Sequence, residues 1–120
     1  MTEPNAGSDL ASIETMAVDD GDEIVLNGSK IFISNGINCG VAVVAAKNPS
    51  DKSPYESTSL YVVESDLPGF IRGRKLEKMG FNSQDTVELF FSNCRIPKTN
   101  MLGQKGMGFK MLMEKLQFER

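Results

Sequence analysis

The chain has 120 residues, of which 40% are hydrophobic and 24% are charged, and its net charge is −3. This composition is that of one globular domain, and it excludes the disordered, collagen-like and membrane-spanning classes. Histidine is absent and there are two cysteines, which excludes Ser-His-Asp and Cys-His nucleophiles as well as a closed zinc site. We therefore expect no bound metal. An acidic domain without basic runs binds nucleic acid poorly, so we also expect no nucleic-acid partner.

The first half of the chain has the pattern of short β-strands. Two β-branched runs, residues 23–26 and 30–34, flank Asn27-Gly28, and an Asn-Gly pair between such runs predicts a type I′ hairpin because both central residues need a positive φ. A second pair, Asn35-Gly36, is predicted to close the next strand. The continuous apolar run 41–46 predicts a strand buried on both faces. It is far shorter than the ~20 residues of a transmembrane helix.

The pattern continues to about residue 92. Polar residues 47–57 contain two prolines and predict an exposed loop. We predict strands at 58–63 and 86–91, a turn at 65–69 and a charged edge strand at 70–78. These elements predict an all-β fold, namely an antiparallel β-barrel or sandwich of six to eight short strands, with the start of an α-helix at the C-terminus.

The last part of the chain changes to a helical period. Residues 93–108 contain three glycines and predict a flexible connection, and from Phe109 apolar residues recur at i, i+3, i+4 and i+7. On a helical projection Arg120 falls inside this apolar stripe and Glu119 on its flank. Charged residues there are costly unless they are paired or used, although they would also be tolerated at a frayed helix end. Because the helix has no stop signal, we expect a segment of a larger protein.

Two segments are candidate ligand contacts. In the first, residues 2–9, Gly7 between small neighbours allows backbone N–H groups to face a ligand. The alternative is a turn and cap formed by Thr2, Ser8 and Asp9, with Glu3 as a further turn former.

In the second segment, residues 31–34, the strand period places Phe32 and Ser34 on one face, where they could cover and hydrogen-bond a flat ring. The alternative is core packing for Phe32 and a cross-strand hydrogen bond for Ser34. Cys39 and Cys94 are interpreted as small, half-buried side chains without a disulfide.

Five stretches together resemble a known family: MTEPNAGSDLAS, GSKIFISNG, GFIRGRKLEKMG, RIPKTNMLG and GFKMLMEKLQFER. They resemble the central β-domain of flavin-dependent acyl-CoA dehydrogenases over essentially the whole chain. The resemblance implies a three-domain protein. Residues 1–103 would be the middle β-barrel domain, and residues 104–120 would be a connection and the first turns of a C-terminal helical domain. An N-terminal helical domain, absent from this chain, would precede them.

The resemblance also implies an oxidoreductase of fatty acid β-oxidation. It implies FAD as the cofactor, an acyl-CoA as the substrate that becomes a trans-2-enoyl-CoA, and an electron-transferring flavoprotein as the electron acceptor. The family's location is the mitochondrial matrix in eukaryotes or the cytoplasm in bacteria, and its members are homotetramers or dimers. The isolated fragment is expected to be inactive.

Residue by residue, the resemblance implies one base, two substrate contacts and five cofactor contacts. Many members carry Trp at the position of Phe32 and Thr at that of Ser34. The closest resemblance is to the long-chain type; the alternatives are an isovaleryl-type dehydrogenase and a β-barrel interaction module of a flavoprotein relative that does not dehydrogenate. The implied roles are Glu119 as the catalytic base, Ser8 and Arg120 as substrate contacts, and Met1, Thr2, Phe32, Ile33 and Ser34 as FAD contacts.

Overall fold

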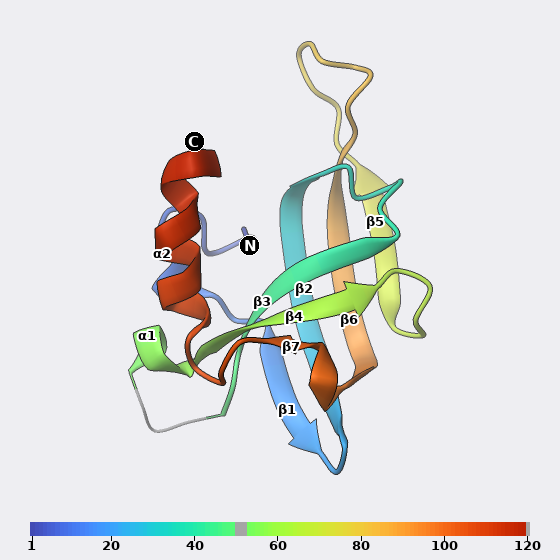
Figure 1. Cartoon of the computed structure of the whole chain (residues 1–120). Helices are drawn as coiled ribbons and strands as arrows, with labels where there is room; N and C mark the ends of the chain where they lie inside the picture. Colours follow the sequence, from blue (N-terminus) through green and yellow to red (C-terminus); the bar gives the residue numbers. More distant parts are fainter. Residues whose placement is uncertain (50–52, 120) are drawn as a thin grey trace.

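The computed structural model describes residues 1–49 and 53–119, with the side chains of 117–119 excepted. This part of the chain forms seven β-strands, two α-helices and two 3-10 helices (Figure 1). The strands are β1 (Met16–Asp20), β2 (Glu23–Ser34), β3 (Val41–Lys47), β4 (Thr58–Glu64), β5 (Phe70–Lys75), β6 (Thr86–Pro97) and β7 (Met101–Leu102). The helices are η1 (Leu10–Ser12), α1 (Pro54–Ser57), η2 (Lys98–Asn100) and α2 (Gly108–Glu119).

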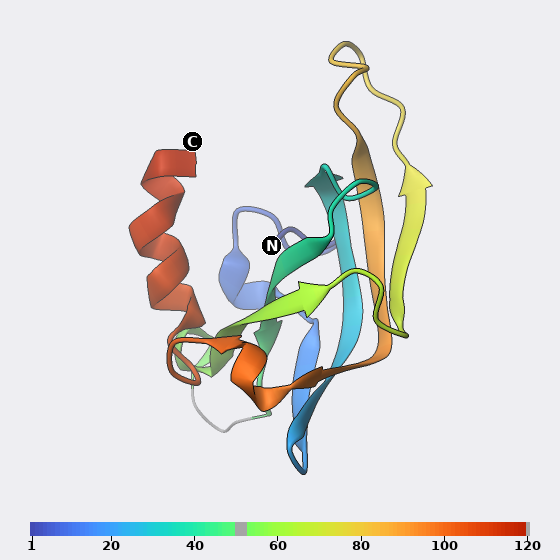
Figure 2. The same cartoon turned by 45° about the vertical axis from the view of Figure 1, so that its right-hand side comes forward.

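All seven strands belong to one sheet, in the order β5-β6-β2-β1-β3-β4-β7. The pairs are antiparallel except β1 and β3, which meet in parallel at Met16 and Lys47. The sheet curls so that β3 and β4 cross over β2 and β6 (Figures 1 and 2). Apolar side chains from six strands fill the space between, among them Leu26, Val63 and Val87. The predicted all-β fold with a C-terminal helix is confirmed, with the sheet left open at β5 and β7.

The hairpin predicted at Asn27-Gly28 is wrong. β2 runs through this pair without a turn, and the register against β6 shifts there, which marks a β-bulge. The chain turns instead at Gly21, whose φ is 63°, between β1 and β2. Gly28 has φ 153°, and a Cβ on it would lie 2.5 Å from Thr15 Oγ1. The extra residue of this bulge lies on β6, since Leu26 and Gly28, two positions apart, pair with Cys94 and Phe91, three positions apart, and Asn93 has φ 48°.

The remaining predicted strands and turns differ less from the structure. β3 is buried on both faces only at residues 44–46, while Val41 and Val43 are 54% and 55% exposed. The predicted loop 47–57 contains helix α1, and residues 50–52 of that loop lie outside the described residues. The turns at 35–36 and 65–69 are confirmed, and β5 is an edge strand as predicted. Both cysteines are free, with Cys94 fully buried.

Helix α2 packs against β4 and α1. The Phe109 ring meets the Tyr55 ring edge-to-face, with the ring centroids 4.9 Å apart. At Gly108 the backbone comes so close to β4 that an added Cβ would lie 2.8 Å from Ser59 Cα. The glycine here allows close packing, which corrects the interpretation of residues 93–108 as a merely flexible connection. Within the described residues, no helix is long and apolar enough to cross a membrane.

Candidate functional site

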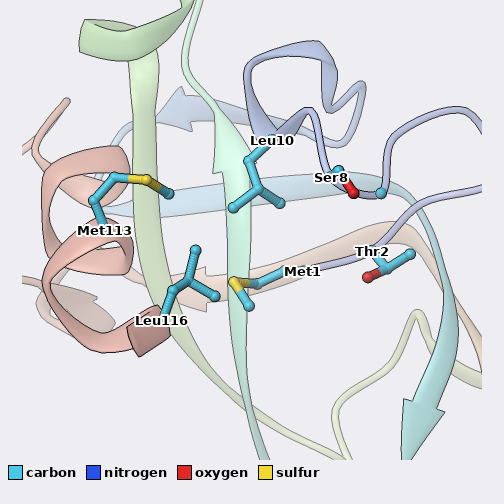
Figure 3. A pocket seen from close by; sticks show the side chains of 7 residues that line it. Met1, Thr2, Ser8, Leu10, Met113 and Leu116 are labelled. Carbon is cyan, nitrogen blue, oxygen red and sulfur yellow. The ribbon is translucent and has the colours of Figure 1, made fainter. Parts of the chain in front are cut away.

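A pocket lies between the N-terminal loop and helix α2 (Figure 3). Its volume is about 460 Å³, within the usual range for small-molecule sites. The loop contributes two hydroxyl groups, and both the loop and the helix contribute apolar side chains. The lining residues are Met1, Thr2, Gly7, Ser8, Leu10, Met113 and Leu116. The structure therefore brings three of the predicted site residues, Met1, Thr2 and Ser8, into one pocket with α2.

The loop that carries these residues is held by its own backbone. Glu3 and Ala6 exchange two backbone hydrogen bonds of 2.8 and 3.1 Å, and Ala6 is buried. Asp9 then accepts hydrogen bonds from the Ala11 N–H and the Ser12 hydroxyl, which caps η1 and confirms Asp9 as a turn former. Across the described residues, the structure gives the hydroxyls of Thr2 and Ser8 no comparable capping bond. Those two hydroxyls remain available to a ligand in the pocket.

The second candidate segment lies directly beside this loop. The Ile31 N–H donates a 2.9 Å hydrogen bond to the Thr2 carbonyl, so the loop runs along β2 just before Phe32. The register of β2 against β6 shifts between Lys30 and Ile33, and Phe32 within this bulge has φ 59°. Phe32 and Ser34 are both exposed while Ile31 and Ile33 are half-buried, which agrees with the predicted shared face of Phe32 and Ser34. The alternative, core packing of Phe32, is wrong, since its side chain is 63% exposed.

The bulge separates the predicted FAD contacts. Phe32 is 63% exposed and lines a second hollow, of about 650 Å³, together with residues 74–77 on and after β5. Ile33 is half-buried against the core, and Ser34 is exposed at the end of β2. Met1 and Thr2 thus line one pocket and Phe32 another, and the hydrogen bond between Thr2 and Ile31 joins the two segments.

A buried ion pair lies behind the loop, and the sequence interpretation missed it. The Glu3 backbone closes the turn at residues 3–6, as predicted, and its carboxylate in addition lies 2.6 Å from Lys30 Nζ, with each side chain 3% exposed. Burial raises the pKa of Glu3, but hydrogen bonds from Lys30, Thr15 and the Glu14 N–H outweigh it, so the pKa is lowered overall. Burial also lowers the pKa of Lys30, against the effect of Glu3. The sequence did carry a signal for burial of Lys30, because it lies an even number of residues after the buried Ile24 and Leu26 and so shares their face of the strand.

The predicted base and one substrate contact lie at the end of the chain. Glu119 is the last residue of α2, but its side chain lies outside the described residues, as does Arg120 altogether. The structure therefore leaves both roles as predictions. Earlier on the helix, Lys110, Glu114 and Lys115 are exposed, as the helical projection predicted. The described residues contain no group of His, Cys, Asp and Glu side chains that could hold a metal ion.

Comparisons with known proteins agree with this architecture. The family model for the acyl-CoA dehydrogenase middle domain matches residues 1–94. The mitochondrial long-chain specific acyl-CoA dehydrogenase of Sus scrofa is 49% identical over 121 residues, which cover 100% of this chain and 28% of that protein. The mitochondrial isovaleryl-CoA dehydrogenase of Pongo abelii is 39% identical, again over the whole chain and over 29% of its own length.

A solved structure also matches the fold. The acyl-CoA dehydrogenase from Geobacillus kaustophilus has a TM-score of 0.95 at 58% identity, over 99% of this chain and 32% of that one. The chain thus spans less than a third of the length of these relatives. Its fold, the match to the family model and these identities show that the chain belongs to the acyl-CoA dehydrogenase family, in which it corresponds to the middle domain.

Proposed function

We propose that residues 1–103 are the FAD- and acyl-CoA-binding middle domain of an acyl-CoA dehydrogenase, and that residues 104–120 lead into its C-terminal helical domain. The full enzyme would oxidise the α,β bond of an acyl-CoA thioester to a trans-2-enoyl-CoA. The pocket between the loop and α2 carries this proposal, because the hydroxyls of Thr2 and Ser8 share it with the apolar side chains of Met113 and Leu116. A thioester with a fatty acyl chain needs this mixture of polar and apolar contacts.

The residues of the site fit a flavin. An exposed aromatic ring, Phe32, stands next to the segment that carries Thr2, and such a ring can stack on a flat heterocycle. At Gly7 an added Cβ would meet nothing within 4 Å, so the backbone there is open to a ligand. In this proposal Met1, Thr2, Phe32, Ile33 and Ser34 hold the ring system of FAD. Bound FAD would supply the hydride acceptor for the reaction.

The proposal assigns the proton transfer to a carboxylate, which is the natural candidate within this chain because these 120 residues contain no histidine. In the proposal Glu119, one helical turn beyond Leu116 on α2, removes a proton from the carbon next to the thioester carbonyl. That C–H bond breaks, its electron pair forms the α,β double bond, and a hydride leaves the β carbon. Ser8 and Arg120 hold the acyl-CoA in place. Hydrogen bonds to the thioester carbonyl stabilise the negative charge that develops on its oxygen.

The relatives support the long-chain type over its alternative. Identity is 49% to the long-chain protein and 39% to the isovaleryl protein. We therefore propose a long-chain acyl-CoA as the substrate and an electron-transferring flavoprotein as the electron acceptor. The enzyme would be a homo-oligomer, located in the mitochondrial matrix or, in a bacterium, in the cytoplasm.

The test uses the full-length protein that contains this chain. We expect it to purify with bound FAD, and anaerobic addition of a series of acyl-CoA thioesters should bleach the flavin fastest with long chains. Fastest bleaching by isovaleryl-CoA would replace the long-chain assignment. A protein that holds no FAD, or whose FAD no acyl-CoA reduces, would favour a β-barrel interaction module instead.

Two variants test the residue assignments. Thr2→Ala should shift the flavin spectrum, because it removes a hydrogen bond worth about 0.5–1.5 kcal/mol. Ser8→Ala should raise the KM for acyl-CoA more than it perturbs the flavin. Ser92→Ala, at an exposed position on β6, is the matched control. If the Thr2 and Ser8 variants behaved like this control, the loop would have only a structural role.

A further inference from the structure

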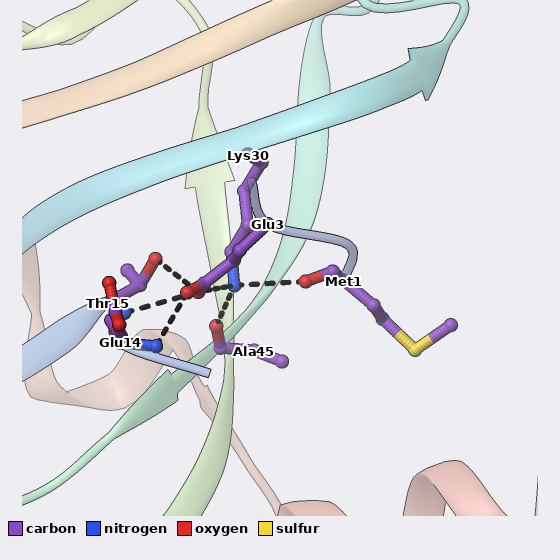
Figure 4. Close-up of polar contacts among 6 residues, drawn as sticks. All are labelled: Met1, Glu3, Glu14, Thr15, Lys30 and Ala45. Atoms are coloured by element: carbon purple, nitrogen blue, oxygen red, sulfur yellow. Dashed lines mark hydrogen bonds and ion pairs between the residues drawn. The ribbon is translucent and has the colours of Figure 1, made fainter. Parts of the chain in front are cut away.

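Among the ion pairs of the described residues, Glu3–Lys30 is the one in which both side chains are buried (Figure 4). The other ion pairs of this part of the chain join side chains that are between 22% and 75% exposed. Burying two charges carries a desolvation penalty of several kcal/mol for each ion, and it is tolerated only with good geometry and full hydrogen bonding. Solubility explains charged side chains at the surface, but it does not explain this buried pair.

Both groups are fully hydrogen-bonded. Lys30 Nζ donates to Glu3 Oε1 at 2.6 Å, to the Ala45 carbonyl at 2.7 Å and to the Met1 carbonyl at 3.2 Å. These three bonds use every donor of an ammonium group. The Glu3 carboxylate also accepts from the Thr15 N–H at 3.1 Å, from the Thr15 hydroxyl at 2.6 Å and from the Glu14 N–H. Figure 4 shows these contacts converging from the N-terminal loop, from Glu14 and Thr15 just before β1, and from β2 and β3.

The position of the pair relates it to the proposed cofactor site. Glu3 directly follows Thr2, and Lys30 precedes Phe32 by two residues. Between them, the Ile31 N–H donates to the Thr2 carbonyl. The pair therefore ties together the two segments to which the proposed function assigns the FAD contacts. It sets the register of the loop along β2, and through the Met1 carbonyl it also fixes the residue before Thr2.

Stability alone does not require charges at this place. Replacement of a buried ion pair by apolar residues of similar volume is often neutral or stabilising, whereas removal of one partner is strongly destabilising because the other charge remains unpaired. Apolar side chains pack without fixed direction, while a carboxylate and an ammonium group impose defined hydrogen-bond directions. What the charges add is orientation of the loop.

We propose that Glu3 and Lys30 are positioning residues, which hold the Thr2–Ser8 loop against β2 in the geometry that binds FAD. This inference rests on the proposed function. It goes beyond that function by assigning the cofactor geometry to two residues that do not themselves line the pocket.

The test compares single and double variants of the full-length flavoprotein. Lys30→Met leaves the Glu3 carboxylate buried without its partner, and Glu3→Gln keeps the size of the side chain but removes its charge. The double variant Glu3→Gln/Lys30→Met removes both charges at once. Arg95→Met is the matched control, because Arg95 makes ion pairs of 2.7 and 2.8 Å with Asp20 and Glu23 while remaining 50% exposed.

We expect the double variant to regain most of the thermal stability that Lys30→Met loses, but not the cofactor affinity. Its Kd for FAD should remain at least about tenfold weaker than that of the wild type, since a misplacement of about 1 Å costs on the order of 100-fold in function. The absorption spectrum of its bound flavin should also shift. Arg95→Met should leave both the Kd for FAD and the flavin spectrum unchanged.

A second measurement reports on the order of the loop independently of cofactor binding. Hydrogen exchange should accelerate at the Ala6 and Ile31 amides of the double variant, while core amides of β6 keep their protection. The proposal is overturned if the double variant recovers FAD affinity together with stability, if the loop amides keep wild-type exchange, or if every variant fails to fold. If the wild type itself held no FAD, the proposed function would fail, and the exchange experiment would still decide whether the pair orders the loop.

Discussion

Gly28→Ala tests the corrected path of the chain through β2. A Cβ on Gly28 would lie 2.5 Å from Thr15 Oγ1 and 2.7 Å from Thr15 Cα, so backbone as well as side chain would have to move. Overpacking of this kind costs about 1–3 kcal/mol. The φ of 153° adds a conformational cost of about 1–3 kcal/mol for a residue with a side chain. We expect a loss of about 2–6 kcal/mol in the free energy of unfolding.

Gly21→Ala is the matched control. Gly21 also has a positive φ, 63°, but an added Cβ there would meet nothing within 4 Å. This variant should lose only the cost of the left-handed conformation, about 1–2 kcal/mol. A loss in Gly28→Ala beyond that of Gly21→Ala therefore reports chiefly on the contact with Thr15, whose hydroxyl also donates to the Glu3 carboxylate.

Urea unfolding, followed by circular dichroism with linear extrapolation, measures both losses, and an unchanged m-value would show that the variants unfold from the same compact state. If Gly28→Ala lost no more than Gly21→Ala, the close packing of Gly28 against Thr15 would be refuted. Gly28 would then behave like a residue of an exposed hairpin turn, as the Asn-Gly pair alone suggests.

Four further predictions follow from the site and the core. Glu119→Gln in the full-length enzyme should slow flavin reduction by acyl-CoA about 10²–10⁴-fold while FAD stays bound; a near wild-type rate would place the base elsewhere. Residues 1–120 alone should bind FAD weakly, because only residues 2–8 and 32–34 would reach the ring, and submicromolar binding in a fluorescence titration would contradict this. Because the pKa of Glu3 is lowered from its ordinary 4.5, its stabilising contribution is present above that value and lost as the pH falls through the folded-state pKa. In urea unfolding at acidic and neutral pH, the free energy of unfolding of Glu3→Gln should therefore fall less steeply with decreasing pH than that of the wild type. Cys94 is fully buried and burial raises its pKa, so a thiol reagent should label it much more slowly than Cys39 in the folded chain and at a comparable rate in urea.

Local patterns were enough to predict most elements of this protein. The alternation in 86–91 predicted the first half of β6, and the spacing of Phe109, Leu112 and Leu116 predicted α2. These predictions succeeded because the period of apolar residues follows directly from the geometry of a strand or helix that buries one side. The resemblance in residues 1–12 likewise pointed to the loop that lines the pocket.

Contacts between distant residues decided the rest. Asn27-Gly28 fits a hairpin turn by its local pattern, and only the pairing with β6 on both sides of it shows that the strand continues. Lys30 and Glu3 are charged, so each by itself is expected at the surface, and burial is tolerated only when the fold brings them together with the carbonyls of Met1 and Ala45. The sequence by itself determined most of the strands and helix α2, but not helix α1 in the predicted loop 47–57 or strand β7 in the predicted connection. The tertiary structure decided how they align, because desolvation, packing and buried hydrogen bonds depend on neighbours that lie far apart along the chain.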